Sequence, residues 1–405
     1  MKPLTTLIIV LGILSFNSGF INATCSLNLN IFPPKIVSRF GSKNLLRPFE
    51  PVVTRELSRT VDLYCANGFT MSSYHVYQIT DPHLQLICDH NGFTKYLESH
   101  GSEVTVERLE CADSQSLGMY ESRTALPDCE DFMTLVVGFD FGELGSLKNV
   151  AICYDIVKQQ LKYISYTAYP TNLIEKTQEG QLDRLGLDVG VTYSNSMFKQ
   201  ISTLDITNGF SKDKQLKLLF GEETFEYQNL IQDMTFKSDL STFENMLSIV
   251  WLRALRNGNW KHLLNALQKA NLNGKYDVRV GVSGVVSLPM LQNCNETRQL
   301  TIDLENGDTV SVPAHIWAHI RALQPSLNGT DEFVVVAHNS PFITNNERLG
   351  LCSSICEQVD WLKDTLFSKL QHYPVYGIIQ CCRLSDVEDK LDNFPTSADI
   401  IRSVG

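Results

Sequence analysis

The chain has 405 residues, of which 43% are hydrophobic and 20% are charged. This is the composition of a globular protein, with enough length for one large domain or two of moderate size. The formal net charge of −11 argues against a simple polyanion-binding protein, because an acidic surface does not attract nucleic acid at long range. A local basic patch is still compatible with that charge.

The N-terminus predicts a secretory signal peptide over residues 1–23. Lys2 supplies a positive charge, residues 7–14 form an apolar run, and small and polar residues follow. The run is too short to cross a bilayer, which takes about 20 apolar residues. No later stretch is long and apolar enough to do so. We therefore expect a secreted, extracellular protein with no membrane span.

The eleven cysteines divide the chain into parts. Six lie between residues 25 and 153, none between 154 and 293, and five from 294 onward. No C-x-x-C pair occurs, which argues against zinc ribbons and thioredoxin chemistry, and in a secreted chain the default expectation is disulfides. An odd count leaves at least one thiol free or paired with another chain. We expect a disulfide-rich β region over 24–170, followed by a second domain over 171–405.

Within this framework, adjacent Cys381 and Cys382 are expected to bond to separate partners, because neighbouring cysteines rarely bridge each other. The cysteines that we assign to disulfides include Cys65, Cys88, Cys111, Cys129, Cys153, Cys352, Cys356, Cys381 and Cys382. Asn295 and Asn328 each begin a glycosylation sequon, which fits the same oxidising compartment.

In chain order, the first clear elements are strands over 134–141, 150–156 and 161–169, which are rich in β-branched and aromatic residues and form a meander. Residues 171–240 are weakly patterned and predict loops, with a short helix near 212–220. A capping box at Ser241 and Glu244 then predicts a central helix over 241–256, with one apolar stripe. Asn257 and Gly258 indicate its end, and Asn259 caps a following helix that contains Trp260 and Leu263.

Strands are expected again over 276–286, 300–304 and 333–337, with a hairpin turn at Asn306 and Gly307. His315 and His319 have the spacing of a metal pair on a helix, but the glutamate of a zincin motif is missing. A strand is the favoured alternative, with both histidines on one half-exposed face. The fold class predicted from these elements is α+β.

Several segments resemble the secreted DNA/RNA non-specific endonucleases, the ββα-metal nucleases related to endonuclease G. The closest similarity is to insect double-stranded-RNA nucleases. It extends over about residues 58–395 and is carried by segments 61–69, 136–139, 150–155, 161–169, 257–263, 280–289, 312–317 and 335–341. The resemblance implies a ββα-metal nuclease-type domain, Mg²⁺-dependent cleavage of DNA and RNA, and terminal disulfides among Cys352, Cys356, Cys381 and Cys382.

The residues that the family uses for catalysis are replaced here. The family needs an Arg-Gly-His base, a helical asparagine that holds Mg²⁺, an upstream asparagine and a glutamate. Residues 101–261 contain no histidine. Counting from Trp260, the metal asparagine becomes Arg256, the glutamate Leu264 and the upstream asparagine Leu247. A guanidinium is permanently charged and repels a divalent cation.

Two hypotheses follow. Either the chain is a catalytically inactive member that acts by binding nucleic acid or another extracellular protein, with no cofactor and a possible homodimer, or it is an active Mg²⁺-dependent nuclease with a rearranged site. A shifted alignment could bring Asn245 or Asn257 near the lost positions, but no shift supplies the missing base. His262 could be a base only in a rearranged site, and a surface helix position is its simpler role.

Overall fold

The computed structural model describes residues 24–29, 32–37, 45–46, 52–98, 101–113, 117–140, 146–168, 181–199, 201–221, 224–233, 240–290, 293–324, 330–343 and 350–395. The chain divides into two compact units. Unit 1 comprises Met1–Pro34 and Glu50–Asp113, and unit 2 comprises Lys35–Phe49 and Ser114–Gly405. Residues 1–23, predicted as a signal peptide, and Asn328 lie outside the described residues. Within the described part, no helix is long and apolar enough to cross a membrane.

Unit 1 is built from short β-strands. One set runs in the order β4-β1-β11-β6-β7 and another in the order β10-β9-β8-β5. β1 alternates exposed and buried residues, so that Leu27 and Leu29 enter the core. The bounds are β1 Thr24–Leu29, β4 Val52–Glu56, β5 Thr60–Tyr64, β6 Phe69–Ser72, β7 Val76–Ile79, β8 His83–Asp89, β9 Gly92–Leu97, β10 Ser102–Thr105 and β11 Arg108–Cys111.

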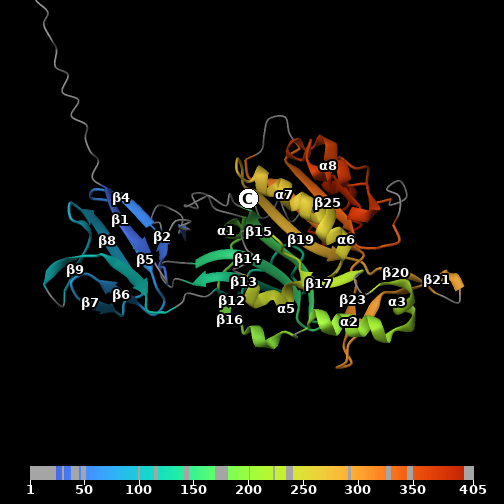
Figure 1. Ribbon diagram of the computed structural model, residues 1–405, viewed down its shortest axis with the longest axis horizontal. Helices are drawn as coiled ribbons and strands as arrows, with labels where there is room; N and C mark the ends of the chain where they lie inside the picture. The colour runs from blue at the N-terminus through green and yellow to red at the C-terminus, as the bar shows by residue number, and fades with distance from the viewer. Residues whose placement is uncertain are drawn as a thin grey trace, which may run out of the picture. The chain divides into compact units, whose positions relative to one another are not determined.

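Unit 2 is organised around a nine-stranded sheet in the order β16-β12-β13-β14-β15-β19-β24-β25-β26 (Figure 1). Its strand pairs β12–β16, β12–β13, β13–β14, β14–β15, β15–β19, β19–β24, β24–β25 and β25–β26 are antiparallel. Its strands are β12 Gly118–Glu121, β13 Met133–Asp140, β14 Ser146–Asp155, β15 Gln160–Ala168, β16 Val191–Thr192, β19 Tyr276–Ser283, β24 His315–Ala322, β25 Glu332–His338 and β26 Ile379–Cys382. The meander predicted over 134–169 is confirmed as β13, β14 and β15. Within the sheet, β15 pairs antiparallel with β19. The domain boundary at residue 170 stays a prediction.

Both faces of this sheet are covered. One face packs against the apolar side of α7 (Lys261–Ala270), where Leu263 and Leu267 join a core with Val280 and Ile316. The other face packs Trp317 and Val334 under the chain around Leu391 and Phe394. The predicted strand with His315 and His319 is confirmed as β24. Its expected half-exposure holds for His315 and is wrong for Trp317 and His319, which this second layer buries.

Shorter elements complete unit 2. The predicted hairpin at Asn306 and Gly307 is confirmed, with Gly307 at φ +83°. The expectation of mostly loops over 171–240 missed α2, whose capping box is formed by Ser202 and Asp205. The remaining bounds are β2 Lys35–Val37, β3 Leu45–Leu46, α1 Gln181–Arg184, η2 Asn195–Met197, α2 Thr203–Lys212, α3 Lys214–Leu219, β20 Ser287–Met290, β21 Asn293–Gln299, β22 Thr301–Asp303, β23 Thr309–Ser311, η6 Cys356–Gln358, η7 Asp360–Leu362, α8 Leu366–Leu370, η8 Pro374–Tyr376 and η9 Leu384–Asp386.

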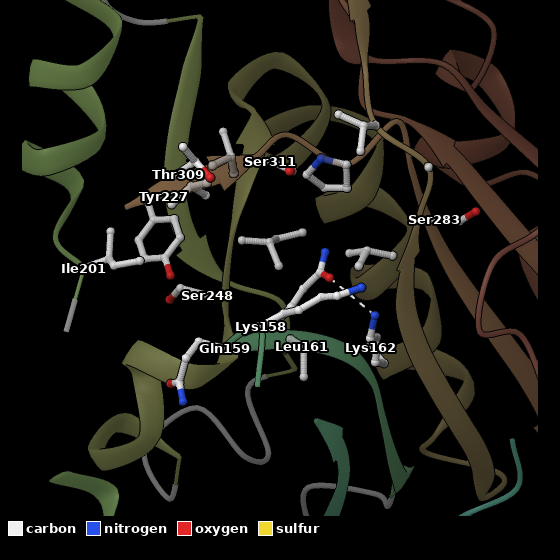
Figure 2. Close-up of a pocket in the computed structure, with 18 of the residues that line it drawn as sticks. Lys158, Gln159, Leu161, Lys162, Ile201, Tyr227, Ser248, Ser283, Thr309 and Ser311 are labelled. Atoms are coloured by element: carbon white, nitrogen blue, oxygen red, sulfur yellow. Dashed lines mark hydrogen bonds between the residues drawn. The ribbon is translucent and has the colours of Figure 1, made fainter. Parts of the chain in front are cut away.

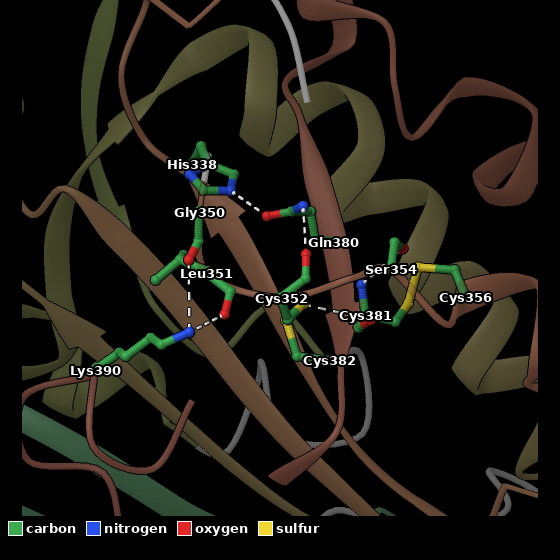
Figure 3. The surroundings of a disulfide bond; sticks show 10 residues. All are labelled: His338, Gly350, Leu351, Cys352, Ser354, Cys356, Gln380, Cys381, Cys382 and Lys390. Carbon is green, nitrogen blue, oxygen red and sulfur yellow. Dashed lines mark hydrogen bonds between the residues drawn. A yellow bond between two sulfur atoms is a disulfide. The ribbon is translucent and has the colours of Figure 1, made fainter. Parts of the chain in front are cut away.

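Five disulfides are present, each within one unit. Unit 1 contains Cys25–Cys88 and Cys65–Cys111, and unit 2 contains Cys129–Cys153, Cys352–Cys382 and Cys356–Cys381. Adjacent Cys381 and Cys382 have separate partners, as predicted (Figure 3). Together these bonds use every cysteine except Cys294, whose side chain lies outside the described part.

The central helix predicted over 241–256 is wrong. Residues 241–247 form only two short turns, η3 (Ser241–Phe243) and α5 (Glu244–Leu247), and the chain then enters strand β18 (Ser248–Leu252). Ile249, Val250 and Trp251 favour a strand, and a short apolar run buried on both faces cannot be distinguished from a helix by periodicity alone. β18 pairs antiparallel with β17 (Phe225–Asn229).

The principal helix follows this hairpin instead. It comprises α6 (Arg253–Leu255), a π-helical turn η4 (Arg256–Trp260) and α7. The expected stop at Asn257 and Gly258 is a kink, with non-helical dihedral angles at Gly258. A Cβ at Gly258 would lie 2.4 Å from the carbonyl oxygen of Tyr376, so only glycine fits beside η8.

Asn339 joins the β17–β18 hairpin to the central sheet. Its fully buried side chain accepts a hydrogen bond from the Leu252 N–H at 2.5 Å and donates to the carbonyl oxygens of Val250 and Pro313, each at 2.9 Å. The amide thus extends the hydrogen bonding of β18 on the edge where none of the described strands pairs with it. Three buried backbone groups depend on this one side chain.

We predict that Asn339→Asp lowers the free energy of unfolding by about 3 kcal/mol, because a carboxylate cannot donate to two buried carbonyls. Asn273→Asp, at an exposed position of the same unit, is the matched control and should change it by less than about 0.5 kcal/mol. Denaturant unfolding of both variants measures the difference. Equal stabilities would contradict the role given to Asn339.

Candidate functional site

The β17–β18 hairpin and the kinked helix carry the positions at which the family resemblance implies catalysis. Leu247 is completely buried, and Leu264 is partly buried against the same core. Both side chains therefore act in packing. Arg256 lies on η4, at the kink, and is the only one of the three family positions that carries a charge.

Arg256 on η4 forms an ion pair with Glu226 on strand β17 of the hairpin. Its Nε donates to Glu226 Oε1 on β17, and Asn257 Nδ2 donates to the same oxygen at 3.2 Å. The side chains of Arg256 and Glu226 are only 22% and 17% exposed, so the pair is largely shielded from water. A guanidinium and an amide thus converge on one carboxylate.

This donor set does not fit the Mg²⁺ that the resemblance implies. Magnesium prefers several oxygen ligands, whereas here Glu226 is the carboxylate and its Oε1 already accepts from Arg256 and Asn257. A cation would have to displace a permanently charged guanidinium. The described residues contain no group of three or more His, Cys, Asp or Glu side chains that could hold a metal ion.

The other weak candidates are not brought into this arrangement by any described contact. Asn245 lies on α5, before β18 rather than on the principal helix, and its backbone oxygen accepts from Tyr227 Oη at 3.4 Å. His262 lies on α7, where its ring contacts Tyr376 edge-on with centroids 6.5 Å apart. These contacts place neither side chain beside the Arg256–Glu226 pair.

The sequence identified Arg256 but missed its partner. Glu226 lies in segment 225–239, the counterpart of the family's Arg-Gly-His segment, which contains neither histidine nor arginine. The available signal was the alternation of Phe225 and Tyr227 with Glu226 and Gln228, which is typical of a strand with one polar face. That face is the one on which Glu226 meets Arg256.

A second polar cluster lies on β24 and β25. His315 and His338 are opposite each other, with ring centroids 5.1 Å apart. His319, four residues along the strand, is about 13 Å from His315 by strand geometry. It instead contacts Glu332 Oε1 at 2.8 Å. The disfavoured alternative, a His315–His319 metal pair on a helix, is therefore not realised.

His338 is a deeply buried member of this cluster. It is 1% exposed, its Nε2 lies 3.2 Å from Gln380 Oε1 (Figure 3), and its Nδ1 has no hydrogen-bond partner among the described residues. Burial, and then the neighbouring His315, lower the pKa of His338 to about 4, although the contact with Gln380 acts in the opposite direction. Burial also lowers the pKa of His315 and of His319.

Asn295, the described glycosylation candidate, is exposed on β21. Its modification stays a prediction.

Comparisons with known proteins give little. No protein-family model matches the chain, and no curated protein matches it significantly in sequence. Among solved structures it is similar to a chain from the crystal structure of the EndoG/EndoGI complex, which concerns the mechanism of EndoG inhibition. That match has 13% identity and a TM-score of 0.29, and covers 54% of this chain and 82% of that chain. At this level the likeness assigns neither a fold nor an activity.

We predict that Arg256 and Glu226 are energetically coupled. A double-mutant cycle with Arg256→Met and Glu226→Gln should give about 1–2 kcal/mol of coupling, since removing one partner leaves the other charge shielded from water. The matched control is Lys212 and Glu305, whose side chains are 57% and 62% exposed and which should couple by less than about 0.5 kcal/mol. Equal coupling in both pairs would refute a special role for the ion pair.

The His338 pKa predicts a pH dependence of stability. Above the unfolded pKa of about 6.5, His338 is neutral in both states. Between 6.5 and the folded pKa of about 4, the unfolded state binds a proton that the folded state does not, so stability falls as the pH falls. Between pH 7.5 and 4, His338→Gln should lose about 3 kcal/mol less unfolding free energy than the unmodified protein. Parallel pH profiles in denaturant unfolding would contradict this prediction.

Proposed function

We propose that this protein is secreted and acts by binding a partner, as a member of the ββα-metal nuclease group without phosphodiesterase activity. Its partner is nucleic acid or another extracellular protein. The observation that carries the proposal is the ion pair between Arg256 and Glu226, with Asn257 on the same carboxylate.

Secretion is supported by covalent chemistry. Five disulfides require an oxidising compartment in most organisms, and they occur in both units. The signal-like N-terminus and the exposed sequon at Asn295 are consistent with export. These features support one cellular location independently of any nuclease resemblance.

The ββα assignment is supported by chain order and pairing. Two antiparallel strands, β17 and β18, lead directly into the principal helix. In the family an asparagine on the helix holds the metal ion. Here the helix presents Arg256 to Glu226 on the first strand. The positive charge of the Arg256 guanidinium balances the negative charge of Glu226, as a bound metal ion otherwise would.

The loss of catalysis follows from what this arrangement lacks. A general base typically contributes about 10²–10⁴-fold to rate, and metal stabilisation of the phosphorane contributes several kcal/mol more. Residues 225–252 contain no histidine, and the described carboxylate Glu226 already accepts from Arg256 and Asn257. A kinked helix held in place by packing can still present a surface to a partner.

The test is a cleavage assay on the purified, oxidised protein with plasmid DNA and double-stranded RNA, in Mg²⁺ or Mn²⁺, beside an active magnesium-dependent nuclease. We expect no cleavage above the buffer rate from the unmodified protein or from Arg256→Asn, because residues of one site act together and no single change should restore activity. Cleavage by the unmodified protein that a chelator stops would establish the active alternative. Strong metal-dependent cleavage by Arg256→Asn alone would reveal a base that the geometry does not show.

A further inference from the structure

Unit 2 contains a cavity of about 820 Å³ away from the Arg256–Glu226 pair (Figure 2). It lies between the β14–β15 turn, the outer side of the β17–β18 hairpin, the end of β19, and β23. Its charged lining residues are three lysines and two aspartates, Lys158, Lys162, Lys199, Asp308 and Asp392. In a chain with 45 acidic and 34 basic residues, this balance is reversed.

Lys162 lines this cavity with a side chain that is largely buried. Its side chain is 10% exposed, and its Nζ contacts Gln160 Oε1 at 3.3 Å. The Nζ also forms an ion pair with Asp155 Oδ2 at 3.7 Å and lies over the Phe132 ring, 4.7 Å from its centroid. Burial lowers the pKa of Lys162, and the charge of Lys158 lowers it further, against the attraction of Asp155.

Lys158 brings a second ammonium group toward the first. In Figure 2 its side chain extends from the turn toward Lys162. Its backbone N–H binds Asp155 Oδ1 at 2.9 Å, but its Nζ makes no hydrogen bond or ion pair among the residues that the structure describes. Two positive charges that repel each other across a cavity are stabilised when an anion enters between them.

The carboxylates of the lining differ in how their charges are balanced. Asp308 pairs with Lys199 at 2.8 Å, so these two charges offset each other. Asp392 accepts from the Gly284 N–H at 2.9 Å and keeps its negative charge, which attracts Lys162. The hydroxyl-bearing residues Ser248, Thr309 and Ser311 also line the cavity, on the side where Figure 2 shows Tyr227. The cavity thus joins a cationic corner to a neutral polar wall.

We propose that this cavity binds a small phosphate monoester, with the dianionic phosphate between Lys158 and Lys162 and the neutral part of the ligand along the hydroxyl-lined wall. A dianion matches two ammonium groups, and each can donate up to three hydrogen bonds to its oxygens. The volume lies within the range of about 300–1,000 Å³ that is usual for small-molecule sites. The site does not use Arg256 or Glu226, so it is independent of the proposed loss of catalysis.

The experiment is isothermal titration calorimetry of the intact, oxidised protein with a nucleoside 5′-monophosphate, the same nucleoside without phosphate, inorganic phosphate, and a short single-stranded oligonucleotide. We expect the monophosphate to bind, inorganic phosphate to bind more weakly, and the nucleoside to show no binding. Binding of the oligonucleotide alone would overturn the proposal, because a phosphodiester is a monoanion.

Three single variants locate the site. Lys158→Gln should weaken monophosphate binding about tenfold or more, because it removes a charge-assisted hydrogen bond. Lys158 is exposed, so this variant should fold normally. Lys162→Gln should weaken binding similarly, whereas Lys269→Gln, an exposed lysine of α7 outside the cavity, should leave it unchanged. Undiminished binding in Lys158→Gln, equal loss in all three variants, or no binding of the monophosphate at millimolar concentration would overturn the assignment.

Discussion

The side chain of Asn339 fixes the geometry on which the site depends. β18 pairs with β17 on one edge, and on the other edge the Asn339 amide meets the backbone of Val250 and Leu252. Asn339 follows β25 directly, and it also binds the carbonyl of Pro313 just before β24. The hairpin is thereby tied to the sheet through two neighbouring strands. The principal helix begins at the next residue after β18, so the hydrogen bonds of Asn339 to β18 also fix where the helix starts.

A second buried amide holds the far side of the same helix. Asn259 donates to the carbonyl oxygens of Leu370 and Gly377, at 2.8 Å and 2.5 Å, and is completely buried. Gly258 and Gly377 allow the close approach that these bonds require. Arg256 is therefore held between two rigid attachments, which makes its pairing with Glu226 a fixed feature of the fold rather than one rotamer of a mobile surface residue.

Sequence patterns predicted the sheet better than the site. The β-branched meander around residues 134–168, the hairpin at Gly307 and the strand at 332–338 follow from local signals that tertiary packing reinforces. The segment at 248–252 was misassigned because Val250 and Trp251 satisfy a helical stripe and a buried strand equally well. Its pairing with β17, and the contact with Asn339, come from residues about 20 and 90 positions away, which no local pattern reports. For the same reason Arg256 was recognised while Glu226 was not.

The disulfides have a consequence for how the protein is made. The four cysteines of unit 1 precede residue 114, Cys129 and Cys153 follow, and the last four lie after residue 351. A chain that enters an oxidising compartment N-terminus first therefore exposes its cysteines in complete sets, and each set can pair before the next one arrives. A group of four thiols has few wrong pairings, whereas ten released together would have very many. Under the export proposed above, the order of translocation would limit wrong pairings. Refolding the full-length reduced chain, which lacks that order, should then depend far more on disulfide isomerisation than its first folding does.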